Sequence, residues 1–130
     1  MKPEIEIKEG KYGCRFVVNS SWRSEFLHLI RKKEIKELYL YTEFGPEANL
    51  SFLPTIPHLE AFAIIDFAIN DISHIHELHF LRSLGVTTYC NTAIDFTQFP
   101  LLEDCSLEWR ARAKSLFKCK TLKHLFLNRY

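Results

Sequence analysis

The chain has 130 residues, of which 47% are hydrophobic and 25% are charged, and its formal net charge is +1. This length supplies apolar residues for one continuous core and leaves no room for a second, so residues 1–130 are expected to form a single domain. The N-terminus lacks the apolar segment of a secretory signal, and no uncharged apolar run approaches the roughly 18 residues of a membrane span. We therefore expect a cytoplasmic protein that does not associate with membranes.

Residues 1–34 are predicted to form an N-terminal cap made of a β-hairpin and a helix. Two short alternating segments, residues 5–7 and 14–18, flank a Gly-containing loop, as they do in a hairpin. Ser20 or Ser21 can cap the helix that follows. The apolar face of this helix is expected to consist of Trp22, Phe26, Leu29 and Ile30.

From residue 35 onward one apolar pattern recurs, hydrophobic-x-x-hydrophobic-x-hydrophobic. The first copy is Ile35-Lys-Glu-Leu38-Tyr-Leu40, and the later copies start at intervals of 24, 22, 21 and 20 residues. They begin at Leu59, Leu81, Leu102 and Leu122. Such spacing is typical of a solenoid, in which each unit buries its apolar edge against its neighbours. Phe16 and Val18 fall 22 residues before the matching leucines, so the hairpin is expected to supply one further unit.

Each unit combines two periods. The last positions of each copy alternate with period two and predict a short strand. Ahead of the strand, apolar residues recur at every third position, which suits a 3-10 or short helical arm. These rows are Leu53, Ile56 and Leu59; Ile72, Ile75, Leu78 and Leu81; Phe96, Phe99 and Leu102; and Leu116, Cys119 and Leu122. The predicted fold class is therefore α/β.

The five copies in phase resemble the leucine-rich repeat family, closest to the subclass with repeats of about 22 residues. The resemblance covers residues 35–130 and implies a short right-handed solenoid with a parallel concave sheet and short helical or 3-10 convex arms. The chain departs from the family at the turn after each strand, where the family has Asn or Cys. The residues at these places are Glu43, Phe67, Tyr89, Arg110 and Tyr130. We expect the asparagine ladder to be missing and the turns to vary in path.

The concave face of the predicted sheet is the candidate binding surface. Its middle is small and uncharged, and tyrosines and a phenylalanine stand nearer its ends, where aromatic residues are typical interface anchors. Small residues serve equally well to accommodate curvature, without a role in binding. The candidate contact residues are Tyr39, Tyr41, Ala61, Ala63, Ile65, Ser83, Thr87, Asp104, Ser106, Glu108 and Phe126.

The leading hypothesis is a non-catalytic module that binds a protein partner through this face, which the resemblance also implies. The alternative is a structural or self-assembling subunit, because the last predicted strand at the C-terminal edge has no capping element after it. Opposite charges could also join subunits into a homo-oligomer. Residues 37–108 contain eleven acidic residues and one basic residue, and residues 109–130 contain seven basic residues and no acidic one. The acidic middle argues against nucleic acid as a partner.

No motif indicates catalysis, a cofactor or a metal. The sequence has no Gly-rich phosphate loop and no G-x-S-x-G turn, and a shallow repeat face excludes water poorly, so an enzyme is not expected. Cys90 with a distant His remains the one candidate thiol–imidazole pair. The segment His74–His79 lacks the H-E-x-x-H spacing and is interpreted as a solvent-facing arm. Cys105 and Cys119 are expected to act as small buried apolar residues.

Overall fold

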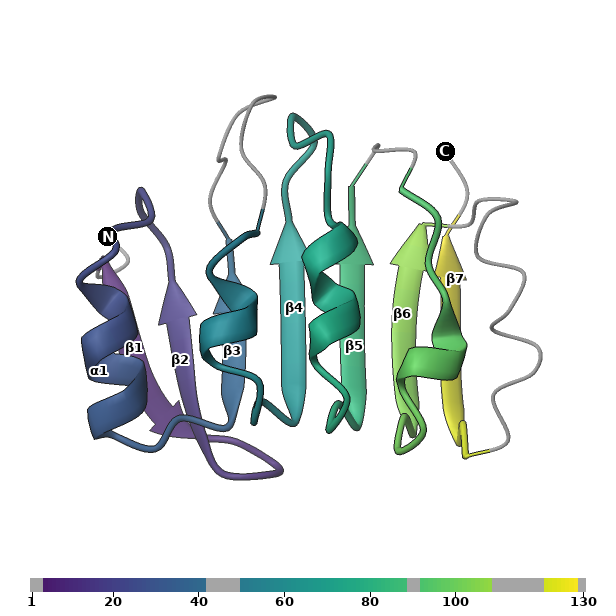
Figure 1. The fold of residues 1–130 in the computed structure, drawn as a ribbon, viewed down its shortest axis with the longest axis horizontal. Coiled ribbons are helices and arrows are strands. Elements are labelled where there is room, and N and C mark those ends of the chain that lie inside the picture. The colour runs from purple at the N-terminus through teal and green to yellow at the C-terminus, as the bar shows by residue number, and fades with distance from the viewer. Residues whose placement is uncertain (1–3, 42–49, 89–91, 109–120, 129–130) are drawn as a thin grey trace.

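In the computed structural model, the described residues are 4–41, 50–88, 92–108 and 121–128, with only the backbone for residues 108 and 126–128. They form an α/β fold with one seven-stranded sheet, whose strands lie side by side in chain order (Figure 1). The pair β1–β2 is antiparallel and every later pair is parallel. The strands are β1 (Ile5–Glu9), β2 (Cys14–Val18), β3 (Glu37–Leu40), β4 (Ala61–Ile65), β5 (Ser83–Thr87), β6 (Asp104–Glu108) and β7 (His124–Asn128).

The predicted N-terminal hairpin is confirmed. β1 pairs with β2 over five residues, from Ile5 opposite Val18 to Glu9 opposite Cys14. β2 then pairs in parallel with β3, and Phe16 lies opposite the first leucine of the repeat pattern. Phe16 and Val18 are both completely buried. The second hairpin strand therefore pairs in register with the first copy of the repeat pattern, as the spacing predicted.

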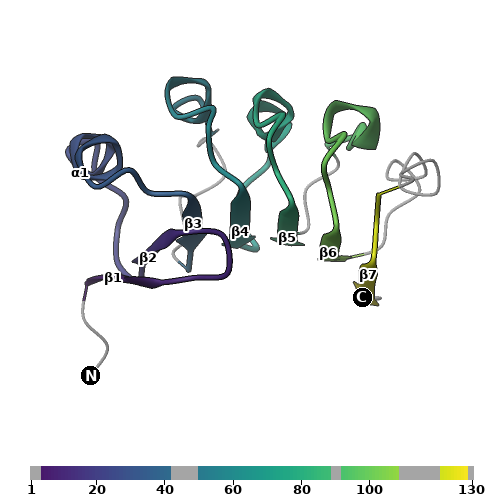
Figure 2. The same cartoon turned by 90° about the horizontal axis from the view of Figure 1, so that it is seen from below.

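Short 3-10 segments cover one face of the sheet. They are η1 (Leu53–Thr55), η2 (Ser73–Glu77) and η3 (Phe96–Gln98), and Figure 2 shows them in a row above the strands. The predicted period of three is confirmed, because every member of the predicted rows from Leu53 to Leu102 is buried. A 3-10 turn accounts for this period, since it places residues i and i+3 on the same side. Leu116 and Cys119 lie outside the described residues.

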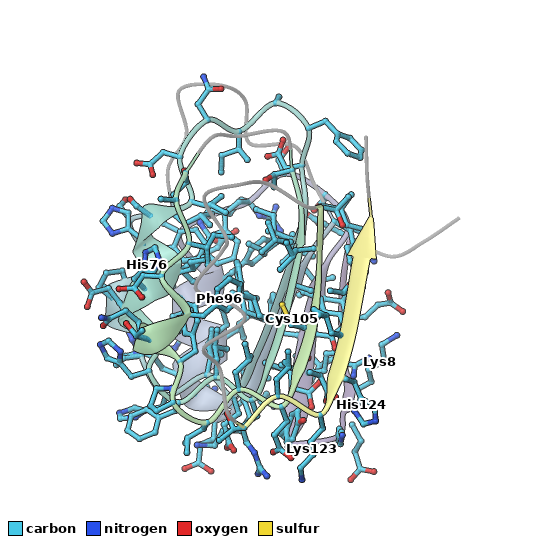
Figure 3. All side chains as sticks on the ribbon, turned by 90° about the vertical axis from the view of Figure 1, so that its right-hand side faces the viewer. Lys8, His76, Phe96, Cys105, Lys123 and His124 are labelled. Atoms are coloured by element: carbon cyan, nitrogen blue, oxygen red, sulfur yellow. The ribbon has the colours of Figure 1, made fainter. Side chains whose placement is uncertain are left out.

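The core fills the layer between the arms and the sheet. Figure 3 shows Phe96 and Cys105 pointing into this layer, and the burial of Cys105 confirms its prediction as an apolar residue. Three further buried residues, Leu50, Ile69 and Ile94, extend the apolar rows toward the preceding turns. We call the face of the sheet that points away from the arms the open face.

The helix of the cap begins later than predicted. α1 spans Phe26–Lys32, and neither Ser20 nor Ser21 caps it, since no side chain makes a capping hydrogen bond. Trp22 precedes the helix, stacks on Phe52 with ring centroids 4.2 Å apart, and meets the first helical ring edge-on at 5.4 Å. This packing of large rings outweighs a serine cap, which contributes only about 1 kcal/mol. None of the helices in the described residues has the length and apolar character of a membrane span.

The turn after β4 uses an aspartate one position earlier than the place where the family has asparagine. Phe67 at the family position is exposed, whereas Asp66 is buried. The Asp66 Oδ1 accepts the backbone N–H of Ala68 at 2.9 Å and that of Ile69 at 3.1 Å. Thr88, at the matching place after β5, is also buried. The asparagine is absent at this turn, and Asp66 satisfies its backbone groups instead.

Candidate interaction surface on the open face

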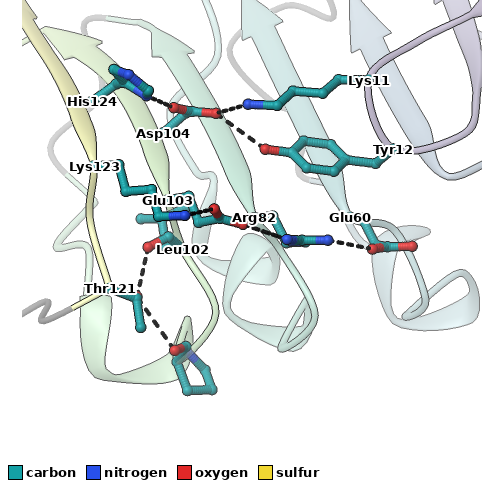
Figure 4. A network of polar contacts seen from close by, with 11 residues as sticks. Lys11, Tyr12, Glu60, Arg82, Leu102, Glu103, Asp104, Thr121, Lys123 and His124 are labelled. Atoms are coloured by element: carbon teal, nitrogen blue, oxygen red, sulfur yellow. Dashed lines mark hydrogen bonds and ion pairs between the residues drawn. The ribbon is translucent and has the colours of Figure 1, made fainter.

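The loop of the N-terminal hairpin crosses part of the open face, and we call residues Gly10–Gly13 the strap. The Tyr12 backbone N–H donates to Glu37 Oε2 on β3 at 2.7 Å, and the Tyr12 hydroxyl donates to Asp104 Oδ2 on β6 at 3.1 Å. Lys11 Nζ contacts the same Asp104 oxygen at 3.3 Å. Figure 4 shows both side chains directed at Asp104. Tyr12 therefore bridges strands that are three positions apart in the sheet.

Glu37 is the buried anchor of the strap, with only 1% of its surface exposed. Arg15 Nε donates to Glu37 Oε1 at 2.8 Å, so both carboxylate oxygens have a partner. A Cβ added to Gly10 would lie 2.3 Å from these oxygens, and glycine therefore permits the close approach of the strap. The Arg15 guanidinium also lies 4.2 Å from the centre of the Tyr39 ring. The anchor thus helps to orient an aromatic residue of the open face.

The strap corrects the predicted contact surface at Ala61. In register, Ala61 lies between Glu37 and Ser83, and Ser83 lies next to Asp104. Tyr12 contacts the two outer members of this row, so the strap passes over Ala61 between them. Ala61 is 1% exposed and is not accessible to a partner, contrary to its prediction as a contact residue.

The uncovered half of the open face forms a groove with a cavity volume of about 560 Å³. The rings of Tyr39 and Tyr41 meet edge-to-face at 6.0 Å on one side of it, and Ile65 at the end of β4 is exposed. The floor is tight, since a Cβ on Gly85 would lie 3.3 Å from the Ala63 Cβ. The predicted contact residues that line the groove are Tyr39, Tyr41, Ala63, Ile65, Ser83, Thr87, Asp104 and Ser106. The side chains of Glu108 and Phe126 lie outside the described residues.

The groove carries little uncompensated charge. Burial on its own raises the pKa of Asp104, but hydrogen bonds with His124, Tyr12 and Lys11 outweigh it, and the pKa lies below its ordinary value. Asp104 is therefore a carboxylate at neutral pH, paired with cationic Lys11. Burial raises the pKa of Tyr39 and Tyr41, so both rings are neutral phenols. The groove consequently offers apolar surface and neutral hydroxyl groups.

Three residues of this surface, Tyr12, His124 and Leu125, are not among the predicted contact residues. Tyr12 was assigned to a hairpin loop, and the two glycines that flank Lys11 and Tyr12 indicated a turn without indicating its direction. His124 and Leu125 line the groove from β7, where His124 lies in register with Asp104. An exposed leucine at a core position is a consequence of the sheet ending there, and the repeat pattern alone predicts burial.

His76 is partly exposed on the arm, and its ring also makes contacts that the prediction of a solvent-facing arm did not include. Its Nε2 accepts the backbone N–H of Asp95 at 2.9 Å, and its Nδ1 lies 2.8 Å from the Ser73 carbonyl oxygen. Its ring stacks on Phe99 with centroids 5.9 Å apart. Because Nε2 accepts a hydrogen bond, Nδ1 is the nitrogen that donates to the Ser73 carbonyl, and the ring joins η2 to η3. Within the part of the chain that the structure describes, no group of three or more His, Cys, Asp or Glu residues could hold a metal ion.

Alternating charges stand at the N-terminal ends of the parallel strands, one residue ahead of each strand from β3 onward. We call this set the edge charge row; it consists of Lys36, Glu60, Arg82, Glu103 and Lys123. Arg82 Nη2 lies 2.6 Å from Glu103 Oε2, and Lys123 Nζ lies 2.8 Å from Glu103 Oε1 (Figure 4). Arg82 Nη1 also lies 3.9 Å from Glu60 Oε1. Hydrogen bonds from Lys123 and Arg82 lower the pKa of Glu103, so this carboxylate stays charged at neutral pH.

Comparison of the chain with protein-family models, with curated protein sequences and with solved structures found no match. The function of the open face is therefore inferred from its geometry. That geometry consists of a covered half, held by the strap at Glu37 and Asp104, and an uncovered groove beside Tyr39 and Tyr41.

Proposed function

We propose that the chain is a leucine-rich-repeat-like solenoid that acts as a non-catalytic protein-interaction module, and that a protein partner docks in the groove of the open face. The in-order parallel strands, the 3-10 arms and the buried apolar rows support this architecture. The observation that carries the function is the groove of about 560 Å³ beside Tyr39 and Tyr41, on the half of the face that the strap leaves uncovered.

The chemistry of the groove favours an uncharged and partly apolar segment of the partner. The exposed apolar surface of Tyr41 and Ile65 gains about 25 cal/mol for each Å² that a partner removes from water. The small floor at Ala63 and Gly85 lets a backbone approach the sheet closely. A charged side chain would lose its hydration there without finding a free countercharge, because Asp104 is already engaged by Lys11.

Replacing Tyr39 and Tyr41 together with alanine tests this proposal. Buried aromatic anchors at interfaces contribute about 2 kcal/mol or more each, so the double variant is expected to abolish capture of the partner. The partner is first identified by a pull-down from the native host with mass spectrometry, and its binding to the purified variants is then titrated. Unchanged affinity of the double variant would exclude the groove as the site.

Two further variants sharpen the test. Phe80→Ala removes an exposed ring that lies beside the edge charge row and outside the groove, and it should bind like the wild type. Thr87→Arg keeps both tyrosines but places a long charged side chain in the groove, and it should bind as poorly as the double variant. Circular dichroism and thermal unfolding establish that each variant is folded. Loss of binding in Phe80→Ala as well would indicate a different or wider site.

A further inference from the structure

Among the described residues, β7 carries an exposed side chain at a core position. β7 pairs with β6 on one side, and none of the described residues pairs with its other side. Leu125 is 42% exposed, whereas its counterparts in register on the four preceding strands are at most 4% exposed. These counterparts are Leu38, Phe62, Leu84 and Cys105. Within the part of the chain that the structure describes, the outer edge of β7 therefore combines backbone groups that have no strand partner with an exposed core position.

The two edges of the sheet differ in their protection against pairing. At the other edge, the antiparallel strand β1 covers β2 and carries Glu6, Lys8 and Glu9 along its length. Charged residues on an outer strand are a common device against edge-to-edge association. The five residues of β7 include no Asp, Glu, Lys, Arg or Pro. Lys123, just ahead of β7, is already engaged by Glu103 at 2.8 Å.

We propose that β7 pairs in antiparallel fashion with β7 of a second copy of this chain, about a two-fold axis at Phe126. In this register all five residues of β7 find a backbone partner, and no charged pair meets within the strand. A two-fold arrangement uses the same surface twice and closes on itself, so it gives a dimer and no fibre. The hairpin supports the geometry, because β1 shows that this sheet accepts a five-residue antiparallel strand at an edge.

The dimer also extends the candidate binding surface. His124 and Leu125 line the groove and belong to the edge strand, so the groove reaches the two-fold axis. Two grooves then meet across the paired β7 strands on the same side of one continuous sheet. This consequence rests on the proposed function, whereas the pairing itself does not.

Sedimentation velocity over roughly a hundredfold dilution tests the pairing at low and at high salt. The wild type is expected to dimerise at both salt concentrations, because backbone hydrogen bonds and apolar burial do not require long-range charge attraction. Leu125→Lys is expected to be a monomer, since the lysine head group cannot be buried at the pairing edge. Ile7→Lys is the matched control, because Ile7 is 45% exposed on the opposite edge strand, and it should remain a dimer.

Several results would overturn the pairing. The pairing is excluded if the wild type is monomeric throughout, or if its dimer forms only at low salt. It is also excluded if Ile7→Lys is a monomer and Leu125→Lys is a dimer. If Leu125→Lys fails to fold, hydrogen exchange of the wild type decides. Protection of the β7 amides should rise with protein concentration, and constant protection refutes the proposal. The variant with alanine at Tyr39 and Tyr41 should stay dimeric, so failure of the groove and failure of the edge are distinguishable.

Discussion

Replacing Gly10 with alanine tests whether the strap depends on its close approach to Glu37. The new Cβ would lie 2.3 Å from both carboxylate oxygens, a distance at which some group must shift. The carboxylate is 1% exposed and accepts hydrogen bonds from the Tyr12 N–H and from Arg15 Nε. It can therefore retreat only by weakening these two bonds.

The expected cost follows from these contacts. A hydrogen bond to a charged group contributes about 1.5–3 kcal/mol, and water replaces part of it when the strap lifts, so we expect a loss of about 2–3 kcal/mol. Glycine-to-alanine replacement by itself stabilises a protein by about 0.4–1 kcal/mol where the backbone conformation is compatible. Gly10 does not adopt a left-handed φ. Gly10→Ala should therefore lower the free energy of unfolding by about 1–2 kcal/mol in urea titrations.

A double-mutant cycle with Glu37→Ala separates the clash from other causes. Glu37→Ala removes the carboxylate that the new methyl group would meet, so in this background Gly10→Ala should be neutral or stabilising by up to about 1 kcal/mol. The destabilisation by alanine at position 10 should thus disappear in the Glu37→Ala background. An equal loss in both backgrounds would refute the reasoning, since it would place the strain in the backbone of the strap.

Three other predictions concern single residues. Glu34 follows α1 in the left-handed conformation, with φ 52°, and the Ile35 N–H next to it donates to the Ile30 carbonyl at 3.0 Å. Because glycine adopts this conformation without strain, Glu34→Gly should raise the free energy of unfolding by about 0.5–1 kcal/mol, and Glu34→Ala should not. Asp66→Ala should cost about 1–3 kcal/mol in urea unfolding, whereas Asp66→Asn keeps an acceptor for the turn and should cost less. The pKa of Asp104 in the folded state lies below its ordinary value of 3.8. The carboxylate therefore contributes its full stabilisation above pH 3.8, and this stabilisation is lost as the pH falls through the folded-state pKa. At neutral pH the free energy of unfolding of the wild type should exceed that of Asp104→Asn by at most about 1 kcal/mol. Thermal unfolding should show this difference shrinking below pH 3.8.

The parts of the fold that sequence periodicity predicts are those that local spacing determines. The apolar rows fix which residues of each arm face the core, and the alternation in each strand fixes which residues reach the open face. The covering of that face was not predictable, because Tyr12 and Asp104 are 92 residues apart in the sequence. Glu37 illustrates the consequence, since its place in the strand assigns it to the outer face and the strap buries it there.

The edge charge row gives a physical meaning to the uneven charge distribution of the chain. Arg82 is the one basic residue among eleven acidic ones between positions 37 and 108, and it lies between Glu60 and Glu103. Exposed ion pairs contribute little stability, so the value of the row is better sought in specificity. The backbone is tied in the same way at each step, because the carbonyl of each row member from Lys36 to Glu103 accepts two N–H groups from the next unit.

Such uniform backbone bonding does not distinguish one neighbour from another, since the strands are of similar length and hydrophobicity. The alternating signs supply the missing distinction. A stack that skipped the unit of Arg82 would place Glu60 beside Glu103, and one that skipped the unit of Glu60 would place Lys36 beside Arg82. Like charges at adjacent positions disfavour both misassemblies, while each native neighbour is of opposite sign. The alternation of signs therefore disfavours these two misassemblies, even where the contribution of the row to the stability of the native fold is small.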